Sequence, residues 1–304
     1  MKSAYRQEEI GDFLSRRYHE RIEWLPVSAG ETSQTFAYAH RQEKRILRIH
    51  PSPEGFRKDQ YAYTHFCSAS VPIPPVLEIG PFDDTHFYCI SVRTEGRTYQ
   101  DSDEFTVKRL LPDLTRLLQS LSETDISGSA GYGVFDSATG NAPFSSWKAC
   151  LEALLDPLRF DWDAVLKKEW IDSRLVTALI AAFRSLIPAC PEIRTLYHGD
   201  FGSNNLLVDE TPRFSGVIDW DCAGYGDFLY DVATAYFWRT WLMCMAHPAA
   251  YWDEVFAGLP HYRERIRCYA LHIGLSELYA SAAEGNASFT RWLLERCRAL
   301  VQEA

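Results

Sequence analysis

The sequence of 304 residues predicts an α+β protein of two unequal lobes, a small antiparallel sheet with one main helix and a large, mostly helical part. Short β-type runs separated by polar turns dominate residues 1–93, whereas helical periodicity dominates residues 94–304. A hydrophobic content of 46% is enough to bury the core of one large domain or of two lobes. A boundary near residue 94 would create a cleft, the usual place for a ligand.

In the first lobe, an amphipathic helix is expected near the start, because Ile10, Phe13, Leu14 and Tyr18 follow helical spacing. A second helix should precede the proline-rich breaker at 71–75. Strands are expected before residue 28 and at residues 34–39, 45–50, 76–80 and 86–92. Together they predict a five-stranded antiparallel sheet.

In the second lobe, helical periodicity is interrupted by a hairpin at 205–218 and by a Ser- and Gly-rich loop at 122–146. Helices are expected at residues 103–121, 146–156, 172–187, 227–245, 259–283 and 286–302. The hairpin is the only β-structure expected here, so it should carry the edge of a site in a helical environment.

The most informative motif is the octapeptide 198–205, His-Gly-Asp-Phe-Gly-Ser-Asn-Asn, followed by Ile-Asp-Trp-Asp at 218–221. Because the start of the first strand of a hairpin lies beside the end of the second, Asn205 and Asp219 should meet at its open end. These two oxygen donors can hold one Mg²⁺, with phosphate oxygens and water completing its shell. Asp200 lies upstream on the same edge, within reach of a second substrate.

This combination is typical of phosphoryl transfer. An acid orients a hydroxyl nucleophile, while an amide and a carboxylate hold Mg²⁺ on a nucleotide. The alternative is a hairpin with polar ends and no ligand.

At these motifs the chain resembles the aminoglycoside phosphotransferase family, whose fold is like that of protein kinases. The resemblance extends over nearly the whole chain, and further segments carry it: residues 55–59, 72–74, 88–91, 237–239 and 273–275. It implies a protein-kinase-like two-lobe fold. It also implies transfer of the γ-phosphate of ATP or GTP to an aminoglycoside hydroxyl, with hygromycin B as the favoured acceptor.

The resemblance further implies roles for individual residues. Asp200 would be the catalytic acid/base, and Asn205 and Asp219 would bind magnesium. The segment 226–231 is similar to the Gly-Asp-x-x-x-Asp segment of the family, which supports the catalytic loop structurally.

A kinase-like small lobe needs a cation on its third strand that pairs with nucleotide phosphates and with an acid on the next helix. Arg48 stands where the family usually has lysine, and Asp59 stands where the glutamate would be. A longer base and a shorter acid offset one another, so we expect an Arg48–Asp59 ion pair that faces the nucleotide. The alternative is Arg48 extended along a surface strand.

Two further segments are candidates for nucleotide binding. Gly30 allows close backbone approach, and the hydroxyls of Thr32 and Ser33 could donate to phosphate oxygens, although an ordinary hairpin turn fits as well. Ser91 and Arg93 stand at the connector between the lobes, where related kinases bind adenine through backbone groups. The end of a strand is the simpler interpretation of that segment.

For the acceptor, the carboxylates of Asp221 and Glu277 could pair with ammonium groups, and the indoles of Trp238 and Trp241 could cover sugar rings. The two tryptophans are three residues apart on a predicted helix and so share a face, which could equally be core. His198 has no second histidine nearby, which favours a structural role, hydrogen bonding to backbone.

The formal charge is −10, and it is unevenly distributed. Residues 1–100 hold 13 Lys+Arg and 13 Asp+Glu, so the entire negative charge falls on residues 101–304. Such a field disfavours nucleic acid and attracts a polycationic small molecule, or it serves only solubility. We expect no nucleic-acid, membrane or protein partner.

Eight scattered cysteines, no signal peptide and no apolar run of spanning length indicate a reduced protein in the cytoplasm. Most of the cysteines should be buried.

Other functions remain open from the sequence. A metal-dependent hydrolase could use His198, Asp200, Asp219 and Asp221 around two ions, although further histidines are usual in such sites. A catalytically silent nucleotide-binding module is a third possibility, and Arg48 leaves room for it. Kinases of choline, homoserine, macrolides or sugars share the Asp200-type loop.

Overall fold

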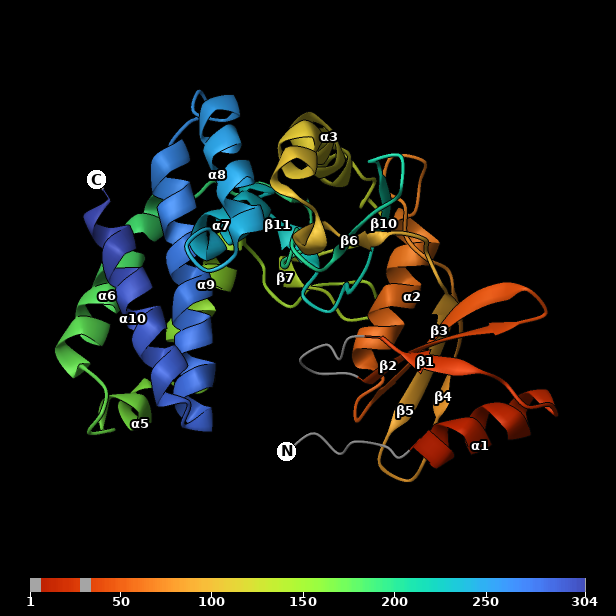
Figure 1. Ribbon diagram of the computed structural model, residues 1–304. Coiled ribbons are helices and arrows are strands. Elements are labelled where there is room, and N and C mark those ends of the chain that lie inside the picture. The colour runs from red at the N-terminus through yellow and green to blue at the C-terminus, as the bar shows by residue number, and fades with distance from the viewer. Residues whose placement is uncertain (1–6, 28–33, 304) are drawn as a thin grey trace.

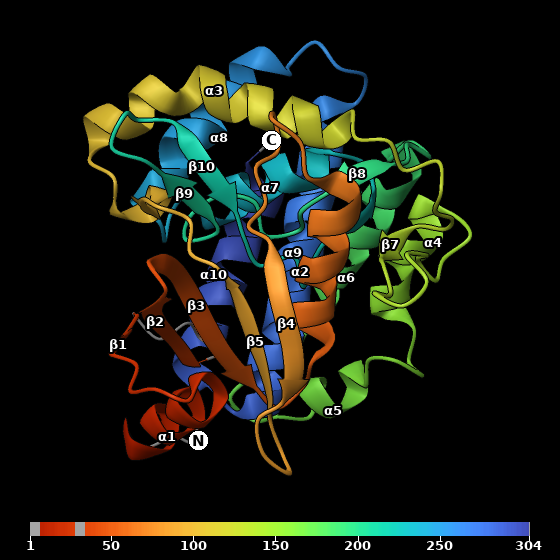
Figure 2. The same cartoon turned by 90° about the vertical axis from the view of Figure 1, so that its right-hand side faces the viewer.

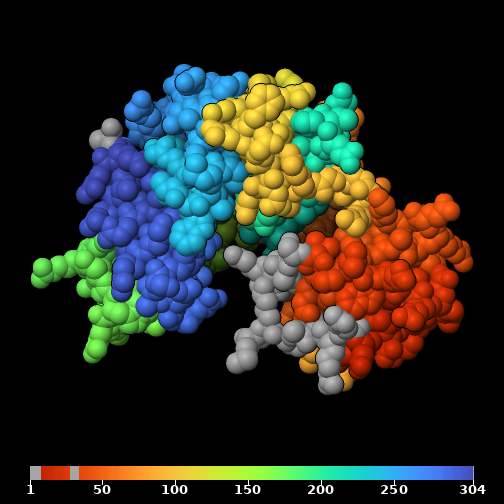
Figure 3. Space-filling view, in the orientation of Figure 1, coloured from red at the N-terminus to blue at the C-terminus, as the bar shows by residue number. Residues whose placement is uncertain are grey.

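The computed structural model describes residues 7–27 and 34–303. They form two lobes of unequal size: the small lobe lies to the right in Figure 1 and the large, mostly helical lobe to the left. Figure 3 shows a hollow between them, bordered on the large-lobe side by α9 (Tyr262–Glu284) and α10 (Ala287–Gln302). The expected two-lobe α+β fold is confirmed.

The small lobe contains the expected five-stranded antiparallel sheet, in the order β1-β2-β3-β5-β4. Its elements are α1 (Gln7–Tyr18), β1 (Trp24–Pro26), β2 (Gln34–His40), β3 (Glu43–His50), α2 (Glu54–Phe66), β4 (Val76–Pro81) and β5 (Phe87–Val92). Strand β3 is central and pairs with both β2 and β5. Side chains that alternate along β3 therefore serve the two faces of the sheet.

One face of the sheet is apolar and is covered by α1. Leu47 and Ile49 of β3 are buried there in one cluster with Ile10 and Leu14 of α1. Arg48 lies between the two apolar residues and therefore points to the opposite face, where α2 lies.

Helix α2 lies between the sheet and the large lobe (Figures 1 and 2). Its residues Ala62 and Phe66 belong to the main hydrophobic cluster of the large lobe. The ring of Phe66 lies 6.0 Å from that of Trp220, which follows Asp219. The small-lobe helix is thus packed against the segment that carries one of the predicted magnesium ligands.

The large lobe combines helices with two small sheets, of orders β10-β9-β6 and β7-β11-β8. Its strands are β6 (Arg97–Thr98), β7 (Gly133–Val134), β8 (Thr195–Tyr197), β9 (Leu206–Val208), β10 (Phe214–Val217) and β11 (Gly224–Gly226). Its helices before α9 are α3 (Glu104–Ser122), α4 (Trp147–Glu152), α5 (Trp162–Leu166), α6 (Ser173–Leu186), α7 (Leu229–Trp238) and α8 (Met243–Val255). The prediction that only the hairpin interrupts the helices was wrong, because strands of two or three residues are too short to show periodicity.

The predicted helix 227–245 was also wrong, because it consists of two helices. Helix α7 ends at Trp238, whose carbonyl oxygen accepts hydrogen bonds from the N–H groups of Trp241 and Leu242. The chain turns there before α8 begins. Apolar residues continue through the turn, so the hydrophobic pattern gives no sign of the break.

The eight cysteines are free thiols, as predicted. The prediction that most are buried holds for Cys89, Cys190, Cys244, Cys268 and Cys297, whereas Cys67 and Cys222 are exposed. Within residues 7–27 and 34–303, every helix is too short or too polar to span a bilayer.

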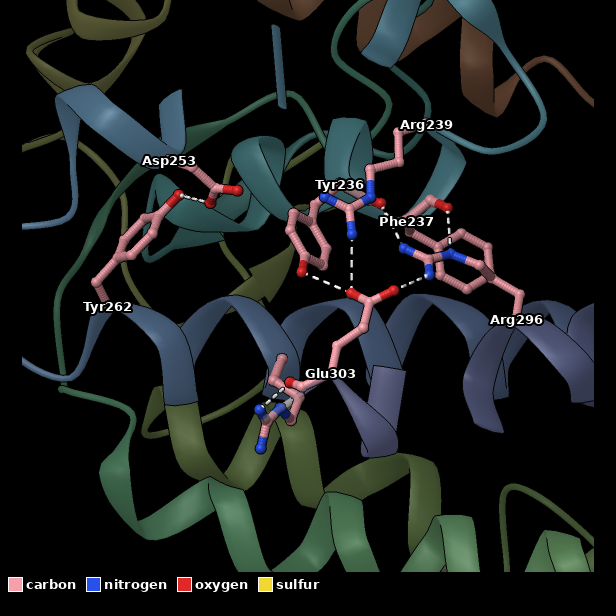
Figure 4. A network of polar contacts seen from close by, with 8 residues as sticks. Tyr236, Phe237, Arg239, Asp253, Tyr262, Arg296 and Glu303 are labelled. Atoms are coloured by element: carbon pink, nitrogen blue, oxygen red, sulfur yellow. Dashed lines mark hydrogen bonds and ion pairs between the residues drawn. The ribbon is translucent and has the colours of Figure 1, made fainter. Parts of the chain in front are cut away.

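A cluster around Glu303 fixes the end of α7 (Figure 4). The Glu303 carboxylate accepts hydrogen bonds from Tyr236 at 2.7 Å, from Arg239 at 2.8 Å and from Arg296 at 3.1 Å. Arg296, 3% exposed, also donates to the carbonyl oxygens of Tyr236 and Phe237. These contacts connect α10 to the last turn of α7 and so hold the residues around Trp238.

Replacing Glu303 by Gln should lower the free energy of unfolding by about 1 kcal/mol at neutral pH, because a charged partner of Arg296 is lost. Burial alone would raise the pKa of Glu303, but the bond from Tyr236 and the charges of Arg296 and Arg239 outweigh it and lower that pKa. A lowered carboxyl pKa contributes stability above the ordinary value of 4.5 and loses it as the pH falls. Denaturant unfolding at neutral and acidic pH should therefore show the difference shrinking in acid, and a difference independent of pH would contradict this.

Candidate functional site

The hairpin of β9 and β10 brings the two predicted magnesium ligands to one end. Leu206 pairs with Val217, and the N–H of Ile218 donates to the carbonyl oxygen of Asn205 at 3.0 Å. Asp219 follows directly. This pairing brings Asn205 and Asp219 close together in space, although they are fourteen residues apart in the sequence.

Asn205 also contacts the predicted catalytic acid. Its side-chain nitrogen donates to Asp200 Oδ2 at 2.7 Å and to the Asp200 carbonyl oxygen at 3.0 Å. The amide oxygen, the atom that would bind a metal ion, therefore points away from Asp200. Asn205 is 2% exposed, whereas Asp200 is only partly buried.

His198 holds this loop against the hairpin. Its Nδ1 accepts from the N–H of Asp200 at 3.3 Å, so Nε2 carries the proton and donates to the carbonyl oxygen of Ile218 at 3.1 Å. Burial lowers the pKa of His198 and favours this neutral ring. The predicted structural role is confirmed. Because both ring nitrogens are bonded to backbone, the metal-dependent hydrolase loses one of its proposed ligands.

Asp231 holds the start of the catalytic loop, residues 198–205, through hydrogen bonds to its backbone. Its carboxylate accepts from the N–H of His198 at 2.8 Å and of Gly199 at 2.7 Å, and burial raises its pKa to about 7. Gly199 has a φ of 83°, and a Cβ there would lie 2.3 Å from the carbonyl oxygen of Cys222. This close approach excludes any larger residue.

Asp227, at the start of the same segment, is fully buried. It binds the guanidinium of Arg265 with both oxygens at 2.8 Å and accepts from Tyr269 at 2.6 Å. The expected support of the catalytic loop is thus confirmed for Asp231, whereas Asp227 binds residues of α9 instead.

Asp219 is suited to a divalent cation. Part of the Asp219 side chain reaches solvent, but surrounding protein atoms partly desolvate its carboxylate. This desolvation, together with the negative charge of nearby Asp59, raises the pKa of Asp219. A bound cation would relieve the cost of keeping the carboxylate charged there. A carboxylate and an amide oxygen are also donors that Mg²⁺ accepts, so the residues fit that ion.

The predicted ion pair between Arg48 and Asp59 is present, and both side chains are largely buried. The second oxygen of Asp59 accepts from the N–H of Trp220 at 2.9 Å. Asp59 therefore links Arg48 of the small lobe to Trp220, the residue directly after Asp219.

Replacing Arg48 by Ala should raise the KM for nucleotide at least about tenfold, because a charge-assisted contact to phosphate is lost. The KM for the acceptor should change little, and Arg48→Lys should retain most of the wild-type behaviour. Steady-state kinetics with both substrates varied would separate the effects. Equal changes in both constants would count against the assignment.

Of the other residues predicted to bind nucleotide, the structure describes only Ser91 and Arg93. Ser91 is buried near the end of β5, on the same face as Cys89, whose sulfur accepts from Arg48. Arg93 is exposed just after β5, and its N–H donates to the carbonyl oxygen of Lys44. Gly30, Thr32 and Ser33 lie outside the described residues.

The two tryptophans predicted for the acceptor lie in one aromatic cluster. Trp241 lies in the turn after α7, so the prediction that both share one helix face was wrong. They meet through Trp292 of α10, whose ring lies 5.6 Å from that of Trp238 and 4.7 Å from that of Trp241. Phe289 stacks on Trp292 at 5.9 Å, and Trp241 remains 54% exposed. Phe289 and Trp292 were missed, although they stand three residues apart on a predicted helix.

The two predicted acceptor carboxylates lie on different elements. Asp221 is exposed on the side of α2, with one oxygen 4.0 Å from Nζ of Lys58. Glu277 is partly buried on α9 and close enough to Tyr230 of α7 to act on it electrostatically.

A two-lobe fold, an ion pair between β3 and α2 and a loop presenting Asp200 and Asn205 beside Asp219 define a phosphotransferase with a kinase-like fold. Residues 23–267 match the model of the phosphotransferase enzyme family, and the chain belongs to this family. It is 36% identical over 299 residues to hygromycin-B 4-O-kinase of Escherichia coli, covering 96% of this chain and 84% of that protein. It is also 45% identical over 51 residues to viomycin phosphotransferase of Streptomyces vinaceus, covering 16% and 18% of the two chains.

Solved structures of aminoglycoside phosphotransferases have the same fold as this chain. A thermostable mutant of aminoglycoside phosphotransferase APH(4)-Ia, in a ternary complex with AMP-PNP and hygromycin B, superimposes with a TM-score of 0.90 at 35% identity, covering 97% of this chain and 98% of that one. The GDP complex of aminoglycoside 2'-phosphotransferase-IIIa gives a TM-score of 0.72 at 16% identity and covers 98% and 99%, a likeness of fold alone. The predicted family and the predicted protein-kinase-like fold are confirmed.

Proposed function

We propose that this phosphotransferase moves the γ-phosphate of ATP or GTP to a hydroxyl of an aminoglycoside, with hygromycin B as the acceptor and antibiotic resistance as the result. The observation that carries the proposal is the meeting of Asp200, Asn205 and Asp219 at one end of the β9–β10 hairpin. The similarity to hygromycin-B 4-O-kinase over 96% of the chain supports the choice of acceptor.

In this proposal Asp200 orients the acceptor hydroxyl and takes its proton as the new bond to phosphorus forms. Asn205 holds Asp200 through its amide nitrogen and offers its oxygen, with Asp219, to Mg²⁺. That ion would neutralise charge on the nucleotide phosphates. Arg48 binds those phosphates from the small lobe and keeps its position through Asp59. Ser91 and Arg93 lie beside the adenine, and Gly30, Thr32 and Ser33, outside the described residues, are proposed to bind the phosphates.

The acceptor side of the proposal depends on the aromatic cluster and on charge. Helices α9 and α10 border the hollow opposite the small lobe (Figure 3), and α10 carries Phe289 and Trp292. Flat rings of this kind cover the apolar faces of sugars, and Trp241 is exposed enough to do so. The acidic residues 101–304, with Asp221 and Glu277, would attract a cationic antibiotic.

We further propose that the lobes divide at residues 93 and 94, the first binding nucleotide and the second carrying the catalytic loop and acceptor site. A cytoplasmic location fits the supply of nucleotide and the eight free thiols.

A coupled assay of ADP and GDP release tests the proposal with a panel of aminoglycosides that includes hygromycin B. Release should rise with hygromycin B, and mass spectrometry should show one phosphate added to it. Choline and a macrolide serve as controls. Release that is independent of any acceptor, or that requires choline or the macrolide, would contradict the proposed substrate.

A further inference from the structure

The backbone of Asp219 adopts an unusual conformation. Its φ is 65°, in the left-handed region, which costs a residue with a Cβ about 1–2 kcal/mol. Such a conformation persists only where the surrounding structure holds it. The direction of the Asp219 carboxylate therefore depends on the contacts that fix residues 218–221.

Contacts from two different lobes hold this segment. Before Asp219, the large lobe supplies them: Ile218 bonds through its N–H to Asn205 and through its carbonyl oxygen to His198. After Asp219, helix α2 supplies them. Asp59 accepts from the N–H of Trp220 at 2.9 Å, and Nζ of Lys58 donates to the carbonyl oxygen of Asp221.

Lys58 is an unusual residue for this position, because its side chain is only 5% exposed. The ammonium group lies 4.0 Å from the Asp221 carboxylate and 5.4 Å from the ring centre of Phe135. Burial lowers the pKa of Lys58, while the carboxylates of Asp221 and Glu54 oppose that shift. An apolar side chain would fill the same space without the cost of removing an ammonium group from water. Stability alone therefore does not explain a lysine here.

We propose that Lys58 is a positioning residue for phosphoryl transfer: together with Asp59 it holds residues 219–221 so that the Asp219 carboxylate faces the divalent ion of the nucleotide. The inference rests on the proposed function. Asp59 also binds Arg48, whereas the bond from Lys58 reaches only the segment after Asp219. Lys58 should therefore affect metal binding while leaving the Arg48–Asp59 pair intact.

The test compares Lys58→Met, which keeps the length of the side chain, with wild type and with Lys108→Met, a change at an exposed lysine of α3. The Kd for Mn²⁺ in the presence of AMP-PNP is measured by electron paramagnetic resonance, and the Mg²⁺ concentration for half-maximal turnover is measured by kinetics. Both should rise by about tenfold or more in Lys58→Met, as expected for loss of a hydrogen bond from a charged group. The KM for hygromycin B is measured as well, and it should rise less than the Kd for Mn²⁺, because Lys58 bonds to the backbone of the proposed acceptor residue Asp221 and leaves its carboxylate in place. Lys108→Met should behave as wild type.

A variant that is less thermostable but binds Mn²⁺ as tightly as wild type would show that Lys58 is only structural and would overturn the inference. Lys58→Gln, which keeps a donor, takes its place if Lys58→Met does not fold, and the same shift of smaller size is expected. If wild type binds Mn²⁺ with AMP-PNP but transfers no phosphate to hygromycin B, the proposed acceptor fails, while the metal titration still decides the role of Lys58. If wild type does not bind Mn²⁺ with AMP-PNP, both fail.

Discussion

Asp200→Asn should lower kcat by about 10²–10⁴, because the acceptor hydroxyl loses the group that orients it and takes its proton. The KM or Kd for nucleotide should remain near the wild-type value, since Arg48 and the hairpin end are unchanged. The amide oxygen of the new residue can still accept from Asn205, so the loop should keep its structure.

Single-turnover kinetics and calorimetric titration with AMP-PNP measure the two effects separately. Thermal unfolding provides the control for folding. A variant that keeps near wild-type kcat would refute the catalytic role of Asp200, and a variant that also loses nucleotide binding would place Asp200 among the nucleotide ligands.

Asp219→Asn should reduce kcat by about a hundredfold or more, because the only carboxylate in the proposed metal site loses its charge. Part of the loss should be recovered at high Mg²⁺. Asp221→Asn is the matched control: it removes an equal charge two residues away, and Asp221 is exposed on the side of α2.

Kinetics at several Mg²⁺ concentrations, with hygromycin B saturating, distinguish the two variants. Asp221→Asn should keep the wild-type dependence on Mg²⁺ and affect mainly the KM for the antibiotic. An equal Mg²⁺ defect in both variants would mean that the negative field of the segment, rather than coordination by Asp219, sets the metal affinity.

The center of the site could be predicted because it depends on local rules. A hairpin of two apolar strands must bring residue 205 beside residue 218, whatever surrounds it. Strand periodicity likewise turns Arg48 away from the apolar face, and toward the next helix with Asp59. The position of these side chains follows from spacing and pairing alone.

The rest of the site depends on tertiary contacts that leave no periodic signal. Lys58 reads as an ordinary charged residue on a helix, and only the packing of α2 against residues 219–221 shows that it is buried. The turn that places Trp241 outside α7 occurs within an apolar run. Trp292 joins the acceptor residues because α10 packs beside the end of α7, a contact between segments about fifty residues apart that spacing rules do not reach.

Anomalous scattering from crystals grown with Mn²⁺, AMP-PNP and hygromycin B would test the central claim most directly. The claim is that Asp200 orients the acceptor hydroxyl, while Asn205 and Asp219 bind the metal ion. We predict that the strongest metal peak lies within coordination distance of both the Asn205 amide oxygen and the Asp219 carboxylate, with a hydroxyl of the antibiotic against Asp200. A metal held by the phosphates alone, with Asp219 turned away, or an antibiotic bound out of reach of Asp200 would contradict this arrangement.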